Sequence, residues 1–125
     1  EGLALFTMVG PSSSQYLGYY GMNGSDLTGD GINEVSSGAY QWRPDTFTYG
    51  AGAVVVVEGT TEHEDSYGDG DYALIAGQVR YNYFGAGVGA ESGDVNGAGY
   101  DDLMAGASGA KSYAGETYIW LGAGL

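Results

Sequence analysis

Residues 25–40 read SDLTGDGINEVSSGAY and set three carboxylates, those of Asp26, Asp30 and Glu34, among three glycines. A second stretch, GDVNGAGYDDLMAGAS at 93–108, has the same layout with one of these acids missing. Two carboxylates about 4 Å apart repel by roughly 4 kcal/mol at an effective dielectric of 20. In a chain of formal net charge −13, such crowding predicts that a bound cation is part of the fold.

The two stretches belong to a repeat that runs through all 125 residues. An offset of 68 residues aligns Asp26 with Asp94 and Glu34 with Asp102, together with several glycines between and after them. An offset of 67 aligns LG (17–18) with FG (84–85), and an offset of 63 aligns GAVVVV (52–57) with GETYIW (115–120). Insertions in loops produce such changes of offset, so we divide the chain into repeat 1, about 1–61, and repeat 2, about 62–125.

Each repeat is predicted to form four short strands, because apolar runs of five to eight residues alternate with Gly, Asn, Asp and Ser. The 25 glycines oppose long helices and favour tight turns. The run Ala53–Val57 is apolar without alternation, so we expect both of its faces to be covered. The predicted strands are 3–10, 19–24, 33–39 and 51–59 in repeat 1, and 72–79, 85–91, 101–107 and 115–122 in repeat 2.

Composition excludes several functions. Only three residues are basic, so nucleic acid is excluded as a partner, and no run is long and apolar enough for membrane insertion. The chain has no Cys, one Lys and one His, His63, which leaves little for nucleophilic catalysis, and we expect no enzyme. A third acidic run, 62–72, surrounds His63 and is interpreted as a solvated loop, with a chance metal site as the alternative.

The ordered motifs resemble the FG-GAP repeat of integrin-α-type β-propellers. Repeat 2 carries FG (84–85), DVNGAGYDD (94–102), GAS (106–108) and GETYIW (115–120), and repeat 1 carries LG, DLTGDGINE (26–34), GAY (38–40) and GAVVVV. The resemblance implies an all-β fold of two four-stranded, integrin-alpha-like propeller blades. It also implies an extracellular or cell-surface protein that binds Ca²⁺ in the two acidic loops.

By this resemblance, position 7 of each nine-residue loop offers its carbonyl and the other positions offer side chains, as suits the oxygen ligands of calcium. Loop 2 has fewer carboxylates, which predicts weaker calcium binding there than in loop 1. The alternative interpretation of each loop is an Asp- and Gly-rich turn without a metal ion. An EF-hand is excluded, because its twelfth position would be Ser37 or Ala105. The implied ligands are Asp26, Thr28, Asp30, Ile32 and Glu34 in loop 1, and Asp94, Asn96, Tyr100 and Asp102 in loop 2.

Two blades do not close a propeller, which ordinarily has four to eight. The chain also starts out of phase, because residues 3–10 match the outermost strand of a preceding blade while 115–122 lacks an outer partner. Strand exchange with neighbouring chains would complete both of these unfinished blades. The result would be a homo-oligomer that closes as a ring of three or four chains or continues as a filament. The alternative is a fragment of a larger integrin-like adhesion protein.

The function predicted from these features is structural or adhesive, in a calcium-stabilised module outside the cell. The alternative is a lectin, because aromatic rings with polar tips suit protein contacts and sugar stacking. Its stacking platforms would be Trp42, Trp120 or the tyrosines near predicted turns and strand ends, namely Tyr19, Tyr20, Tyr40, Tyr49, Tyr81, Tyr83 and Tyr113.

Overall fold

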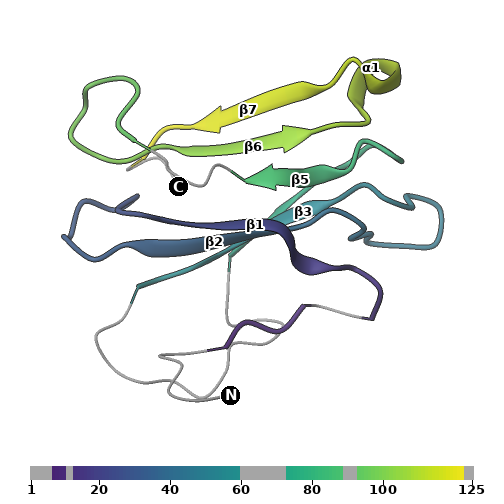
Figure 1. The fold of residues 1–125 in the computed structure, drawn as a ribbon, viewed down its shortest axis with the longest axis horizontal. Coiled ribbons are helices and arrows are strands. Elements are labelled where there is room, and N and C mark those ends of the chain that lie inside the picture. The colour runs from purple at the N-terminus through teal and green to yellow at the C-terminus, as the bar shows by residue number, and fades with distance from the viewer. Residues whose placement is uncertain (1–6, 11–12, 60–72, 89–92, 123–125) are drawn as a thin grey trace.

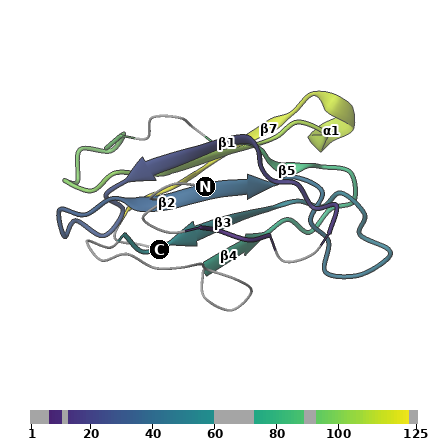
Figure 2. The same ribbon diagram turned by 60° about the horizontal axis from the view of Figure 1, so that its bottom comes forward.

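The computed structural model describes residues 7–10, 13–59, 73–88 and 93–122, and the strands in these ranges form two antiparallel sheets in two layers (Figure 1). The four-stranded sheet has the order β1-β2-β3-β4 (Figure 2), and the three-stranded sheet has the order β5-β6-β7. The predicted all-β class is confirmed. The elements are β1 (Leu17–Ser25), β2 (Glu34–Ala39), β3 (Ala53–Val57), β4 (Ala73–Ala76), β5 (Phe84–Val88), β6 (Leu103–Ala107), a helical turn α1 (Ala110–Tyr113) and β7 (Glu116–Trp120).

The valine-rich strand β3 lies in the interior of the four-stranded sheet, between β2 and β4. Four of its five residues are buried and Val56 is half-buried, so the expectation that both faces are covered is confirmed. Val54 and Val56 pack against the apolar core between the sheets. Val55 and Val57 point to the opposite face, because side chains alternate along a strand.

The expected strand over 3–10 is not found in its described part. Residues 3–6 lie outside the described residues, and within 7–10 only Met8 makes a β-bridge. Thr7 and Met8 line a hollow with Leu17, Met22 and Val35 on the four-stranded sheet. Residues 7 and 8 therefore lie against a face of the four-stranded sheet, and no described strand pairs with this segment over a run of residues.

The two sheets repeat one backbone geometry at the offsets of the sequence repeat. Pairing of Val35 with Val57 in β2 and β3 corresponds to pairing of Leu103 with Trp120 in β6 and β7. The irregularity between Leu17 and Met22 in β1 recurs between Phe84 and Gly87 in β5. Positive φ angles also recur, at Gly18 (80°) and Gly85 (82°), and at Gly52 and Gly115 (both 83°).

The sheets do not coincide with the repeats of the sequence. The four-stranded sheet takes β1, β2 and β3 from repeat 1 and β4 from repeat 2. The three-stranded sheet has β7 at its outer edge, and no strand among the described residues pairs with that edge. The second sheet therefore corresponds to the first without its fourth strand.

The core lies between the sheets and is built from both. Val54 of β3, Phe84 and Val88 of β5, and Leu103 of β6 are buried there, and Leu27 is added from the loop after β1. The backbones of the two sheets approach closely where β2 faces β5. There a Cβ on Gly38 would overlap the carbonyl oxygen of Gly85, so only glycine fits. No helix in the described part of the chain is long and apolar enough to cross a membrane.

Candidate functional site

The antiparallel strands divide the molecule into two chemically different ends. The connection after β1 (26–33) and the described part of the connection before β6 (93–102) lie at the acidic end, at the left of Figure 1. The connections 40–52, 77–83 and 108–115 lie at the opposite end with the start of β1. We call this the tyrosine end, since it carries eight of the twelve tyrosines: Tyr16, Tyr19, Tyr20, Tyr40, Tyr49, Tyr81, Tyr83 and Tyr113.

Loop 1 is organised by its own carboxylates. Asp26 Oδ1 accepts hydrogen bonds from the backbone N–H groups of Gly29 (2.6 Å) and Asp30 (3.1 Å), and its Oδ2 accepts one from Gly31 (2.9 Å). The buried Glu34 accepts at Oε2 from the N–H groups of Leu27 (2.7 Å) and Thr28 (3.1 Å). Asp30 Oδ1 accepts from the N–H of Ile32 (2.8 Å). All five residues that were predicted to bind calcium in loop 1 thus lie in one hydrogen-bonded turn.

Loop 2 repeats the same bonds at the offset of 68. Asp94 accepts from the N–H groups of Ala98 (2.9 Å) and Gly99 (2.7 Å), as Asp26 does from Asp30 and Gly31. Asp102 accepts from the N–H of Val95 (2.8 Å), as Glu34 does from Leu27. Asp102 is 1% exposed and uses its other oxygen to accept from the N–H of Gly122 (2.8 Å). Asn96 Oδ1 accepts from the N–H of Ala98 (3.0 Å).

These hydrogen bonds favour the ionised carboxylates. The N–H of Gly99, with further N–H groups of loop 2, lowers the pKa of Asp94 below its ordinary value of 3.8. The chemistry of the donors fits a hard cation, since both loops offer carboxylate, hydroxyl, amide or carbonyl oxygens. In the described residues, however, no three His, Cys, Asp or Glu side chains come together as a metal-binding group. The carboxylates instead turn toward the backbone of their own loops.

The two loops are also joined to each other. The N–H of Asp101 donates to the carbonyl of Asp26 (3.0 Å), and Asp101 Oδ2 accepts from the N–H of Asp26 (3.1 Å). The ring of Tyr100 lies against Gly29, where a Cβ would overlap it. The sequence did not indicate this role of Asp101, whose position in repeat 1, Asn33, lies outside the predicted ligand set.

The tyrosine end gathers the aromatic rings into one cluster. Tyr40 packs on Tyr16, Tyr19 and Tyr20 with centroid distances of 5.7, 5.7 and 5.0 Å, and reaches Tyr83 of the other sheet at 6.1 Å. The cluster bridges the two sheets at their ends and leaves several rings exposed. Desolvation, with Tyr113 and Tyr81 nearby, raises the pKa of the Tyr83 hydroxyl above its ordinary value.

All three basic residues of the chain lie at the tyrosine end. The Arg43 guanidinium lies 4.7 Å from the ring centroid of Tyr49, and that of Arg80 lies 4.6 Å from the centroid of Tyr81. Lys111 forms an exposed ion pair with Glu116 at 3.6 Å. This end is therefore close to neutral, whereas the described loops of the acidic end carry carboxylates without a basic residue.

A hollow of about 480 Å³ opens within this cluster, between residues of the two sheets. Among the side chains around it, Gln41 is distinctive. Its Oε1 is buried and has no hydrogen-bond partner within the described structure. We call this hollow the tyrosine pocket, and the residues that define it are Tyr20, Tyr40, Gln41, Tyr83, Ala86, Ser108 and Tyr113.

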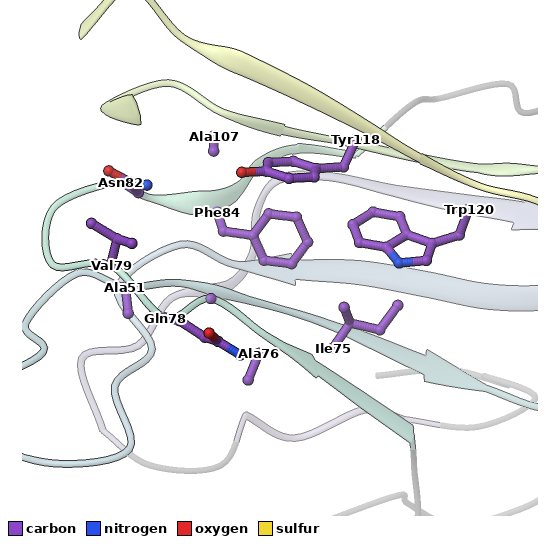
Figure 3. Close-up of a pocket in the computed structure, with 11 residues that line it drawn as sticks. Ala51, Ile75, Ala76, Gln78, Val79, Asn82, Phe84, Ala107, Tyr118 and Trp120 are labelled. Carbon is purple, nitrogen blue, oxygen red and sulfur yellow. The ribbon is translucent and has the colours of Figure 1, made fainter. Parts of the chain in front are cut away.

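A second hollow, of about 270 Å³, lies between the sheets beside β4 and β7 (Figure 3). In Figure 3 the ring of Phe84 lies below Tyr118 and beside Trp120, and Ile75 lies below these two rings. Tyr118 and Trp120 stack at 5.8 Å, and the Tyr118 hydroxyl donates to Glu116 at 2.6 Å. Trp120 is thus packed against the apolar core, and it is half-buried rather than displayed on the surface.

His63 and the acidic run 62–72 lie outside the described residues. Comparison with protein-family models and with curated proteins gives no match.

Proposed function

We propose that this chain is a non-enzymatic, calcium-stabilised structural or adhesive module of the FG-GAP type, which assembles head to tail outside the cell. The observation that carries the proposal is the outer edge of β7, which no strand of the described residues covers, in a sheet that otherwise repeats the first. A complete copy of the sheet needs one more strand, and the repeat indicates which segment supplies it.

Residues 7–9 occupy the sequence position of β4 at the offset of 67, since Met8 corresponds to Ile75. In the four-stranded sheet Val54 pairs with Ile75 and Val55 with Leu74. In the second sheet, Thr117 and Tyr118 correspond to Val54 and Val55 in the sequence repeat. The same register would therefore pair Thr117 with Met8, and Tyr118 with Thr7, of another copy of the chain. In the isolated chain residues 7 and 8 lie on the face of the four-stranded sheet, and β7 belongs to the other layer (Figure 1), so a second copy is the natural donor.

The outer faces of the sheets favour the same association. Ile119 of β7 is 52% exposed and Met22 of β1 is 61% exposed. Removing apolar area from water stabilises by about 25 cal/mol per Å². A head-to-tail contact would bury these faces together with the strand edge, and such a contact closes as a ring or continues as a filament.

The register can be tested by disulfide crosslinking, because the chain has no cysteine of its own. Met8→Cys in one population and Thr117→Cys in a second, differently tagged population should form a mixed disulfide, since directly opposite Cα atoms lie about 4.5–5.5 Å apart. The matched control combines Met8→Cys with Tyr118→Cys, whose side chains would point to opposite faces. Equal crosslinking of both pairs, or none, would contradict the register.

Calcium would bind in loops 1 and 2 through the nine residues named above, with the carboxylates turned inward from their present hydrogen bonds. Its positive charge would offset the repulsion among carboxylates and hold the two loops, and so the two sheets, together. Thermal unfolding followed with 5 mM CaCl₂ and with EGTA should show a higher midpoint in calcium.

Asp30→Asn should reduce the calcium-dependent shift. Asp45→Asn is the matched control, because Asp45 is an exposed carboxylate that also accepts backbone N–H bonds, from Phe47 and Thr48, but at the tyrosine end. Negative-stain microscopy of the same samples should show rings or fibres in calcium and their loss in EGTA. Single molecules in both conditions would favour a fragment of a larger protein instead.

A further inference from the structure

The tyrosine pocket is a concave site at the end of the molecule opposite the acidic loops. Its rings come from both layers, with Tyr20 and Tyr40 from the four-stranded sheet and its connections, and Tyr83 and Tyr113 from those of the three-stranded sheet. Tyr20 is 54% exposed and Tyr113 is 73% exposed, so these rings offer free aromatic surface. From this geometry we propose that the tyrosine pocket binds a neutral saccharide.

Sugars combine apolar C–H faces with a ring of hydroxyl groups, and the pocket offers partners for both. Tyrosine rings provide flat apolar surface, and their hydroxyls, with that of Ser108, can donate and accept. Gln41 Oε1 is the most specific feature, because a buried acceptor without a partner costs free energy. Gln41 lines the pocket, and a rotation of its side chain that brings this oxygen to the pocket surface would let a sugar hydroxyl donate to it and remove that cost.

Charge favours a neutral ligand over an acidic or basic one. None of the seven residues that define the pocket is charged. The nearby guanidinium groups of Arg43 and Arg80 are already held over tyrosine rings, and Lys111 is paired with Glu116. An anionic sugar would therefore find no free cation among these three groups.

The shape favours a sugar over a peptide. The volume of about 480 Å³ falls within the range of about 300–1,000 Å³ usual for small-ligand sites. The pocket lies at the ends of strands, where it presents side chains rather than a row of backbone groups. An extended peptide would instead find its backbone partners along the open edge of β7.

The site is independent of the assembly proposed above. Strand addition would occupy the edge of β7 and the outer sheet faces, whereas the pocket opens between the connections at the strand ends. A head-to-tail assembly would therefore display one such pocket on each chain. This arrangement would raise the avidity for a surface that carries many copies of the sugar.

The test is a microarray of neutral mono-, di- and trisaccharides probed with the full chain, next to an array of sialylated and uronate-containing glycans. The best free saccharide is then titrated by calorimetry into wild type and variants, each with CaCl₂ and with EGTA. Tyr113→Ala and Gln41→Leu alter the pocket. Phe47→Ala is the matched control, because Phe47 is an 81%-exposed aromatic at the same end that does not line the pocket.

We expect a neutral sugar to bind wild type and Phe47→Ala equally, and Tyr113→Ala about five- to tenfold more weakly through loss of one stacking ring. Gln41→Leu should weaken binding by about tenfold through loss of one hydrogen bond. Absence of binding on the neutral array, a preference for the acidic array, or unchanged affinity in both pocket variants would each overturn the proposal. Since the sugar is tested with and without calcium, a failure of assembly would not be mistaken for a failure of the site.

Discussion

Replacing Gly38 by alanine would test how closely the two sheets are held together. The Cβ of alanine would overlap the carbonyl oxygen of Gly85, and it would also crowd the Cα of that residue. Both positions lie inside strands, Gly38 in β2 and Gly85 in β5. Neither obstacle can be removed by a side-chain rotation, so the layers must separate locally.

The expected cost is large because the contact is between backbones. Overpacking a well-packed interior typically costs about 1–3 kcal/mol. We expect Gly38→Ala to reach the upper end, about 3 kcal/mol, against a total stability of about 5–15 kcal/mol for a domain. For a chain of this length, that corresponds to a fall in the melting temperature of about 10 °C.

The assay is thermal and urea unfolding, followed by circular dichroism, of Gly38→Ala and of the repeat-equivalent variant Gly106→Ala. Gly106 has room for a Cβ, since the nearest atom, the carbonyl oxygen of Gly87, would be 3.7 Å from it, an ordinary van der Waals contact. Gly106→Ala should therefore fold with unchanged or slightly higher stability, because alanine in a strand avoids the conformational cost of glycine.

The same pair also tests the assembly. In a head-to-tail contact Gly106 would face Gly18 of the next copy, as Gly38 faces Gly85 within the chain. Gly106→Ala should thus leave the single chain intact and prevent assembly. A melting temperature for Gly38→Ala within about 2 °C of wild type would refute the close packing of the sheets.

Four further variants test the core and the loops. Leu103→Ala empties a fully buried position between the sheets and should cost about 2–5 kcal/mol in urea unfolding. Glu34→Ala leaves two N–H groups of loop 1 without their acceptor and should cost about 1–3 kcal/mol, whereas the exposed Asp30→Ala should cost much less. The lowered pKa of Asp94 stabilises the fold above the ordinary carboxyl pKa of 3.8, and this contribution is lost as the pH falls through the lower folded value. Between pH 6 and pH 2.5 the melting temperature of Asp94→Asn should therefore fall less than that of the wild type. An identical fall in both proteins would contradict the stabilising role of the ionised Asp94 carboxylate.

Local sequence patterns were sufficient to locate β1 to β7 and to predict the shape of the acidic loops, but they also predicted a strand over 3–10 that is not found in its described part. Glycine at Gly29, Gly31 and their repeat partners permits positive φ, and a carboxylate at the first position of each loop accepts the N–H groups that follow. These interactions span at most eight residues, so residue type and spacing determine them. The valine run of β3 likewise required burial on both faces wherever it lay.

The structure alone decided how distant segments meet. The bonds between Asp26 and Asp101 and the neighbouring tyrosines of two sheets depend on how the layers stack, which no local pattern encodes. The segment 7–10 has the sequence of a strand, yet residues 7 and 8 lie on a face of the four-stranded sheet, a placement that depends on tertiary packing rather than on local pattern. The spacing of residues in the sequence therefore determined the backbone geometry that recurs in the two repeats. Packing between the two sheets determined which surfaces stayed exposed, because the burial of apolar side chains does not depend on their distance along the chain.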